Sequence, residues 1–115
     1  MIAFYDMKND AERLAFLDDY RNAENGWYLW KADQERQVRL YRYDVEDLEA
    51  KEGVSFIVEE ELRTVLWPNK HLSWTVRHWY IITESGKKDW TFADQVASRT
   101  QVLNKIKDIQ RRAKK

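Results

Sequence analysis

The chain has 115 residues, the usual length of one domain, and we expect a single domain over 1–115. Its 20 Lys and Arg balance 20 Asp and Glu, so the formal net charge is zero, while 43% of the residues are hydrophobic. This composition excludes disorder of the whole chain and argues against a strongly basic nucleic-acid coat protein. The absence of cysteine excludes disulfides, thiolate nucleophiles and zinc sites with cysteine ligands.

The first predicted element is a helix over 10–23. Asn9 and Glu12 have the spacing of a capping box, in which each side chain satisfies a backbone N–H at the helix start. Apolar residues at helical intervals follow, and Gly26 is suited to the left-handed conformation that ends such a segment.

Segments rich in aromatic, β-branched and alternating apolar residues predict five strands: 27–32, 37–44, 54–66, 72–82 and 88–93. A short helix over 45–52 is predicted between the second and third strands, because Asp44 can cap its start and Gly53 can close its end. A final helix is predicted from residue 99, since Ser98 and Gln101 form a second capping box ahead of a helical apolar stripe.

The turns set the predicted registers. In the first hairpin Leu29 is expected opposite Leu40 and Trp30 opposite Arg39. A loop over 67–71 in the second hairpin gives the pairs Glu60–His78, Glu61–Arg77 and Leu62–Val76. A turn at 84–86 in the third gives Tyr80–Trp90 and His78–Phe92.

The element order α-β-β-α-β-β-β-α predicts an α+β fold. We expect two layers, an antiparallel sheet of about five strands built from three hairpins, with the N-terminal and C-terminal helices and the short helix near 45–52. The sequence lacks phosphate-binding glycine loops and the common hydrolase and metalloprotease motifs. With two histidines, His71 and His78, and no cysteine, we expect neither a metal nor a cofactor.

One pair of side chains has the chemistry of a catalytic site. The predicted register places the carboxylate of Glu60 beside the imidazole of His78, an arrangement suited to proton transfer in RNA cleavage, with Arg77 near a phosphate. The simpler interpretation is structural, because a buried acid and a histidine satisfy each other. We prefer the structural interpretation and keep Glu60, His78 and Arg77 as catalytic candidates.

A second candidate site is the sheet face that the helices are expected to leave open. It would carry aromatic and cationic side chains: Tyr28, Trp30, Arg39, Tyr41, Tyr43, Arg77, Trp79 and Ile81. Aromatic rings among arginines bind single-stranded nucleic acids, and the same residue types dominate protein interfaces. We assign Tyr28, Trp30, Arg39, Tyr41, Tyr43 and Trp79 as binding residues, with plain core packing as the alternative.

The two halves of the chain carry opposite charge. Residues 1–62 hold sixteen acids and eight bases, whereas 63–115 hold four acids and twelve bases. The halves are expected to neutralise each other in the fold, unless they face a charged partner or a second copy. The acidic run 44–61, with eight acids and one lysine, is interpreted as a solvated face, or alternatively as a mimic of a nucleic-acid backbone.

The sequence therefore predicts a small, non-enzymatic binding protein of the inhibitor or adaptor type. Its expected partner is another protein, including a second copy of itself. The alternatives are a single-stranded nucleic-acid binder and a small ribonuclease using Glu60 and His78. No apolar stretch is long enough to span a membrane and the amino terminus lacks the features of a secretory signal, so we expect a cytoplasmic protein without membrane contact.

Overall fold

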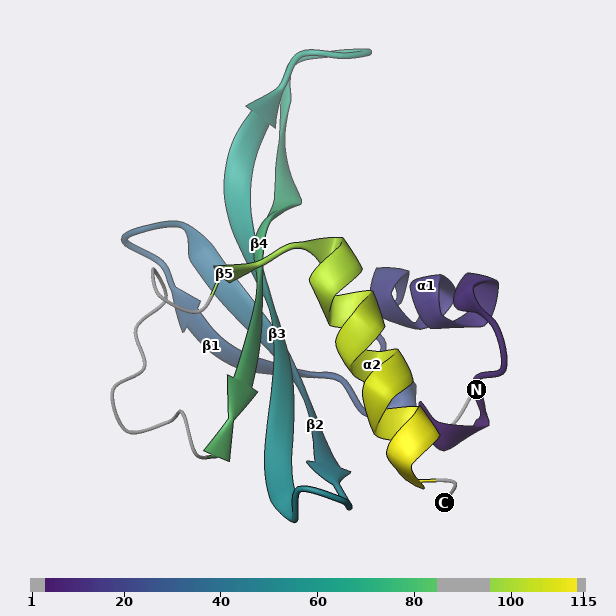
Figure 1. Cartoon of the computed structure of the whole chain (residues 1–115). Coiled ribbons are helices and arrows are strands. Elements are labelled where there is room, and N and C mark those ends of the chain that lie inside the picture. The colour runs from purple at the N-terminus through teal and green to yellow at the C-terminus, as the bar shows by residue number, and fades with distance from the viewer. Residues whose placement is uncertain (1–3, 85–95, 114–115) are drawn as a thin grey trace.

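The computed structural model describes residues 4–84 and 96–113. Its elements in chain order are η1 (Phe4–Asp6), α1 (Asp10–Asp18), η2 (Ala23–Asn25), β1 (Tyr28–Asp33), β2 (Val38–Asp47), β3 (Glu52–Val65), β4 (His71–Thr83), β5 (Val96–Ala97) and α2 (Arg99–Ala113). The strands form one antiparallel sheet in the order β1-β2-β3-β4-β5 (Figure 1). The predicted α+β class, with five antiparallel strands between an N-terminal and a C-terminal helix, is confirmed.

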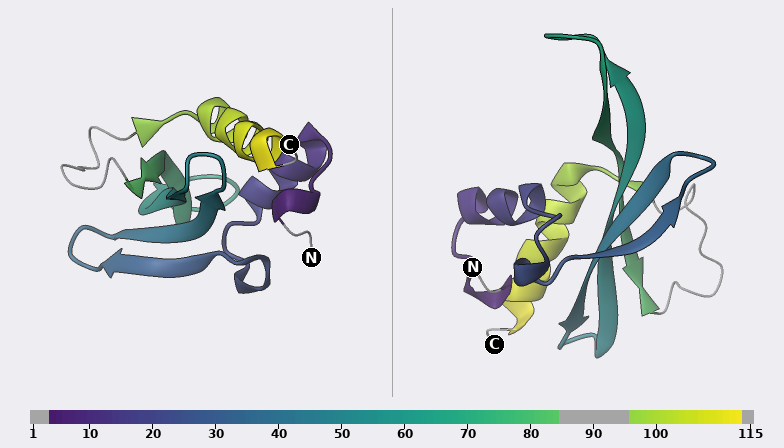
Figure 2. Two further views of the ribbon diagram at one scale, coloured as in Figure 1. Left: turned by 60° about the horizontal axis from the view of Figure 1, so that its bottom comes forward. Right: turned by 180° about the vertical axis from the view of Figure 1, so that it is seen from behind.

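Both long helices lie on one face of the sheet, as the two views of Figure 2 show. The main core lies between the two helices and this face of the sheet. It joins Phe16 and Leu17 of α1, Val102, Ile106 and Ile109 of α2, and Val54, Phe56 and Val58 of β3. The opposite face carries a smaller buried cluster of Leu40, Ile57, Tyr80 and Ile82. Because both faces bury side chains, every residue from Val54 to Glu60 is buried, and β3 is the central strand of the fold.

Both helices begin where their capping residues predict. Glu12 N donates to Asn9 Oδ1 at 2.9 Å, and Gln101 N donates to Ser98 Oγ at 3.1 Å while Ser98 N donates back to Gln101 Oε1 at 2.7 Å. The Ser98–Gln101 capping box therefore has both of its reciprocal bonds. At the first helix Asn9 is the N-cap, and Glu12 Oε2 accepts from Lys8 N at 3.3 Å. The first helix is shorter than predicted, ending at Asp18, because Tyr20 leaves the helix to reach the sheet.

The predicted helix over 45–52 is wrong. Strand β2 continues to Asp47 and β3 begins at Glu52, so the two strands meet in a tight turn. Asp47 Oδ1 accepts a hydrogen bond from Ala50 N at 3.2 Å, and Lys51 takes the left-handed conformation with φ 57°. Asp47, three positions after the predicted capping residue Asp44, thus accepts this bond, and it stabilises a hairpin turn instead of starting a helix.

The registers of both hairpins differ from the prediction. The last pairs before the turns, Asp33–Val38 and Val65–His71, are displaced by two residues, and a β-bulge in each hairpin then reduces the difference to one. In the first hairpin the register shifts after Leu29, which pairs with Tyr41, so that Lys31 rather than Leu29 lies opposite Leu40. In the second hairpin the shift lies between Glu59 and Glu60. The observed pairs there are Glu59–His78, Glu60–Val76, Glu61–Thr75 and Leu62–Trp74. The predicted strand over 88–93, with its Trp90 and Phe92 pairs, lies outside the described residues.

Ion pairs join the acidic and basic halves of the chain. They include Arg77–Glu61 and Lys107–Asp10 on the surface, Arg99–Asp18 between the two helices, and Arg112 with the buried Asp47. Much of the opposite charge of the two halves is therefore neutralised within the fold, as the simpler interpretation of the charge pattern requires.

Candidate functional site

The predicted aromatic site does not form an open surface. Tyr41 and Tyr43 point toward the helices and pack against the main core, and Trp79 is 9% exposed within that core. The Tyr43 ring meets Phe16 edge to face at 5.0 Å between centroids. The expectation that the helices cover the other face is therefore wrong for these residues. Their packing supplies the structural reason for their aromatic character.

The remaining predicted binding residues lie apart from one another. Arg39 makes an ion pair inside the sheet and stacks on Trp74, with its guanidinium carbon 4.1 Å from the ring centroid. Trp30 lies on the opposite face against the smaller cluster, with Arg42 at 4.7 Å from its ring centroid. Tyr28 is partly exposed and donates to Asp44 Oδ2 at 2.7 Å. The structure does not bring these residues into one continuous aromatic surface.

Glu60 is buried on the helix-facing side and does not contact His78 as predicted. Its carboxylate accepts hydrogen bonds from Tyr20, from Arg21 Nε at 3.0 Å and from Arg39 Nε at 2.7 Å. Burial alone would raise the pKa of Glu60, but the bonds from Tyr20, Arg21 and Arg39 outweigh it and hold the pKa below its ordinary value. Burial and the bond to Glu60 raise the pKa of Tyr20, which therefore remains a donor. This cluster links α1 to the sheet.

The neighbouring carboxylate takes the place that the sequence assigned to Glu60. Glu59 Oε1 lies 3.0 Å from His78 Nδ1 and accepts from the Tyr80 hydroxyl at 2.9 Å. Burial and this hydrogen bond raise the pKa of Tyr80. The sequence reasoning missed Glu59 because the loop lies one residue earlier than predicted, which displaces the pairing by two residues. The bulge then restores one of these two residues, so that His78 faces Glu59.

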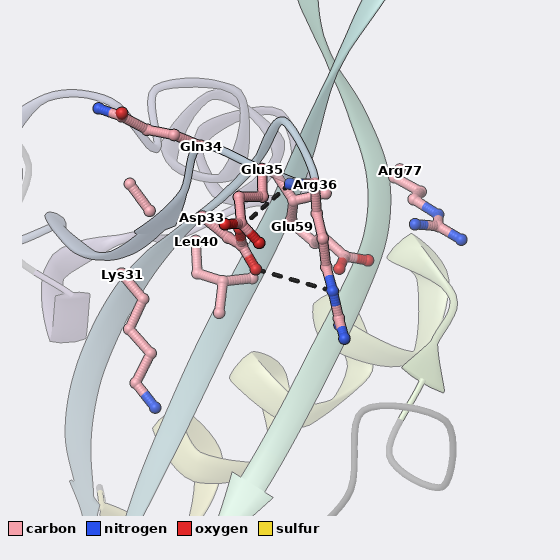
Figure 3. Close-up of a pocket in the computed structure, with 10 residues that line it drawn as sticks. Lys31, Asp33, Gln34, Glu35, Arg36, Leu40, Glu59 and Arg77 are labelled. Atoms are coloured by element: carbon pink, nitrogen blue, oxygen red, sulfur yellow. Dashed lines mark hydrogen bonds and ion pairs between the residues drawn. The ribbon is translucent and has the colours of Figure 1, made fainter.

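A pocket of about 850 Å³ opens beside this cluster. Figure 3 shows it between β1 and the β1–β2 turn, which supply Lys31 and Arg36, and the strands that carry Leu40, Glu59 and Arg77. Its wall carries three cations and three acids, counting Asp33 and Glu35, so its charges balance. The Glu59–His78 contact is a carboxylate–imidazole pair beside the pocket. RNA cleavage was predicted for Glu60 and His78, and these two side chains are not in contact. Within residues 4–84 and 96–113, no group of three or more histidines and carboxylates is suited to hold a metal.

The most exposed apolar side chains of the described chain lie elsewhere, at the end of a long hairpin. We call residues 62–76, the ends of β3 and β4 with their loop, the β3–β4 arm. It extends past both helices in Figures 1 and 2. Trp67 is 84% exposed at its tip, beside Leu66 at 74% and Leu72 at 64%. These residues were predicted to be strand ends and loop. Their exposure becomes visible only in the fold, where no residue of the described chain covers them.

Several charged side chains lie close together at the base of the arm. Arg77 is the unpaired residue of the β4 bulge, and it lies next to Glu61 at 3.8 Å as well as in the wall of the pocket. A bulge turns consecutive side chains toward one face, which explains why both Arg77 and His78 lie near Glu59. The arm and its base therefore form one candidate interaction surface.

Comparisons with protein-family models, curated proteins and solved structures found no match for the chain. None of the helices in the described part of the chain is long and apolar enough to cross a membrane.

Proposed function

We propose that the protein binds another protein, and that the β3–β4 arm is its docking element. The observation that carries this proposal is the exposure of Trp67, Leu66 and Leu72 together on a projecting hairpin. Apolar residues gathered on a surface in this way are typical of interaction sites, and tryptophan is the residue type most enriched in interface hot spots.

The energetic gain of covering Trp67 is large. A tryptophan buries about 200 Å² of mostly apolar surface, which is worth about 5 kcal/mol before the costs of association. The arm contributes little to the core in return, because its tip residues are more than half exposed. Contact with a partner would explain apolar side chains that the core does not need.

The charge of the arm supports a partner with an acidic surface. From Glu61 to Arg77 the chain carries three cations, Arg63, Lys70 and Arg77, against the single acid Glu61. Such an excess accelerates association with an oppositely charged surface and fixes its orientation. The partner expected here is thus an acidic protein. A nucleic acid would stack its bases on several accessible rings, whereas Trp67 is the one highly exposed tryptophan ring of the described arm and the Trp74 ring is covered by Arg39.

The test is capture of a partner from a nuclease-treated extract of the source cells. The wild-type protein is compared with Trp67→Ala and with the control Leu48→Ser, which removes an apolar residue that is 55% exposed outside the arm. We expect the same discrete protein to be retained by wild type and control. Loss of a tryptophan hot spot should weaken binding by about 30-fold or more, so Trp67→Ala should lose it.

Three outcomes would overturn the proposal. Retention of the protein by Trp67→Ala would show that the arm is not the docking element. Loss of capture after nuclease treatment would indicate a nucleic acid. Binding of the wild type, but not of Trp67→Ala, to lipid vesicles in place of any protein would assign the arm to a membrane surface.

A further inference from the structure

We infer that the partner adds an extended, acidic segment as a new strand along the outer edge of β4, over 71–78. This inference rests on the proposed function and specifies the chemistry of its partner. Strand addition uses backbone hydrogen bonds for affinity and alternate side chains for specificity, so it requires a free strand edge with a suitable pattern beside it.

The open edge has a clear structural cause. Among the residues that the structure describes, β5 pairs with β4 at Trp79 and Tyr80 alone. The next residue that would continue this pairing is Ser98, which instead caps α2. The chain therefore turns away into the helix, and β4 has no neighbour on this side over 71–78 within the described part of the chain.

The opposite edge of the arm is shorter. Pairing of β2 with β3 reaches Glu61, and Leu62 N still donates to Gln37 O at 2.9 Å. Only 63–65 extend beyond that point in β3. A strand of ordinary length needs about five residues. The β4 edge, which offers 71–78, is thus the side that can accept a whole strand.

Backbone groups near this edge are within reach of outside donors. The carbonyl oxygen of Trp74 accepts a hydrogen bond from Arg21 Nη2 at 3.3 Å, although that side chain belongs to the segment after α1 and is half exposed. An added strand would supply such donors in a regular ladder. A long unpaired edge is otherwise a liability that proteins cover or pair.

The side chains along β4 define the pattern of the added strand. Leu72 and Val76, exposed at 64% and 42%, lie on the face of the arm that carries Trp74, so the partner needs apolar residues at alternate positions. From Lys70 to Thr83 the chain has two cations, Lys70 and Arg77, and no acid. Glu61 of β3 is the acid beside Arg77, at 3.8 Å, but it also lies 3.6 Å from Arg63, so that one carboxylate faces two half-exposed or exposed arginines and cationic charge remains. Acidic residues at the intervening positions of the partner would meet this charge.

A second copy of the chain does not satisfy this pattern. An antiparallel pair of two β4 edges would bring the cationic and histidine positions of one copy next to those of the other, with no acid between Lys70 and Thr83 to oppose them. Like charges opposite each other destabilise a strand pair. The edge therefore selects a different, acidic chain.

The inference is tested with three synthetic nine-residue peptides and the full-length protein, followed by amide hydrogen exchange. One peptide alternates Val and Glu, the second alternates Val and Lys, and the third is the Val/Glu peptide with a central proline. We expect the Val/Glu peptide to slow exchange within 71–78. The proline peptide should have no such effect, because proline removes a ladder hydrogen bond.

The acidic preference is tested by Arg77→Glu, with Arg77→Gln as a milder variant should the reversal unfold the protein. Binding of the Val/Glu peptide should weaken by about tenfold in the charge reversal, since like charges then meet at the interface. Equal protection by the Val/Lys peptide would overturn the acidic assignment. Protection of 71–78 that rises with protein concentration and needs no peptide would show self-pairing instead.

The two proposals fail separately. If capture depends on Trp67 but no peptide protects 71–78, the arm docks a partner by its tip and the strand-addition inference is wrong. If the Val/Glu peptide protects 71–78 while capture does not depend on Trp67, the edge binds and the tip does not. Failure of both experiments removes the arm as a binding element.

Discussion

At the scale of single residues, the sheet depends on one fully buried charge. Glu60 has no exposed surface, and its two oxygens receive hydrogen bonds from Tyr20 and Arg21 on one side and Arg39 on the other. A buried ion pair contributes little net stability compared with apolar packing, but removal of one partner leaves an uncompensated charge. The contacts of Glu60 thus give it a structural role in the fold.

We predict that Glu60→Gln lowers the free energy of unfolding by about 3 kcal/mol, because the mostly buried Arg39 then loses its counter-charge and Arg21, which is half exposed, loses its main partner. Urea unfolding at neutral pH measures the change. Glu24→Gln, which removes an exposed acid, is the matched control and should have almost no effect. A loss no greater than that of the control would contradict the structural role.

The same residue predicts a pH dependence with a definite sign. The pKa of Glu60 is lower in the folded protein than its ordinary value of 4.5, so the folded state binds fewer protons than the unfolded chain. The stability from Glu60 is therefore complete above that value and is lost as the pH falls toward the lower folded pKa. The difference between wild type and Glu60→Gln should shrink below about pH 4.5. A difference that is constant or grows would contradict the assignment.

The sequence placed Glu60 opposite His78, whereas the structure places Glu59 there. The triplet Glu59, Glu60 and Glu61 offers three similar candidates, and the position of the turn together with the bulge decides among them. Alternation of apolar residues sets a register only where the strand is regular. Residues at the bulge were therefore beyond prediction, although Arg77 and Glu61 are neighbours as expected.

At the scale of elements, predictions succeeded where local chemistry decides. The helix caps at Asn9 and Ser98 involve residues three apart, and both helices begin there. The strands 54–66 and 72–82 also agree with β3 and β4 within about two residues. The helix over 45–52 failed because Asp and Gly favour both helix ends and hairpin turns, and the choice came from pairing of Val45 with Val54.

The arm and the core should respond differently to substitution. We predict that Leu66→Ser and Leu72→Ser each change the free energy of unfolding by less than about 0.5 kcal/mol, as exposed positions do. Phe56→Ala, at a position with no exposed surface in β3, should cost about 3–5 kcal/mol. Chemical denaturation monitored by circular dichroism compares the three. A loss above about 2 kcal/mol in the arm variants would show that these residues stabilise the fold rather than meet a partner.

In the whole molecule, the opposite charges of the two halves are partly paired with each other and partly left on the surface. Much of this charge is neutralised by ion pairs between the halves, such as that of Arg112 with Asp47 across 65 positions of the chain. A cationic remainder stays on the arm. The face of β3 that the helices cover, with Val54, Phe56 and Val58, is the more apolar one. The covered face of β2 could not be predicted, because Leu40 lies on one face of that strand and Tyr41 and Tyr43 on the other. This choice buried Tyr41 and Tyr43 and moved the candidate surface to the arm.

Site-specific photo-crosslinking in the source cells shows whether the tip of the arm contacts a protein partner. A benzophenone amino acid replaces Asn69, which is exposed in the tip loop beside an intact Trp67, and in a second variant it replaces Leu48, which is exposed outside the arm. We expect one discrete covalent protein adduct from position 69 and none from position 48. Absence of an adduct from position 69, or the same adduct from both positions, would show that the tip does not dock the partner.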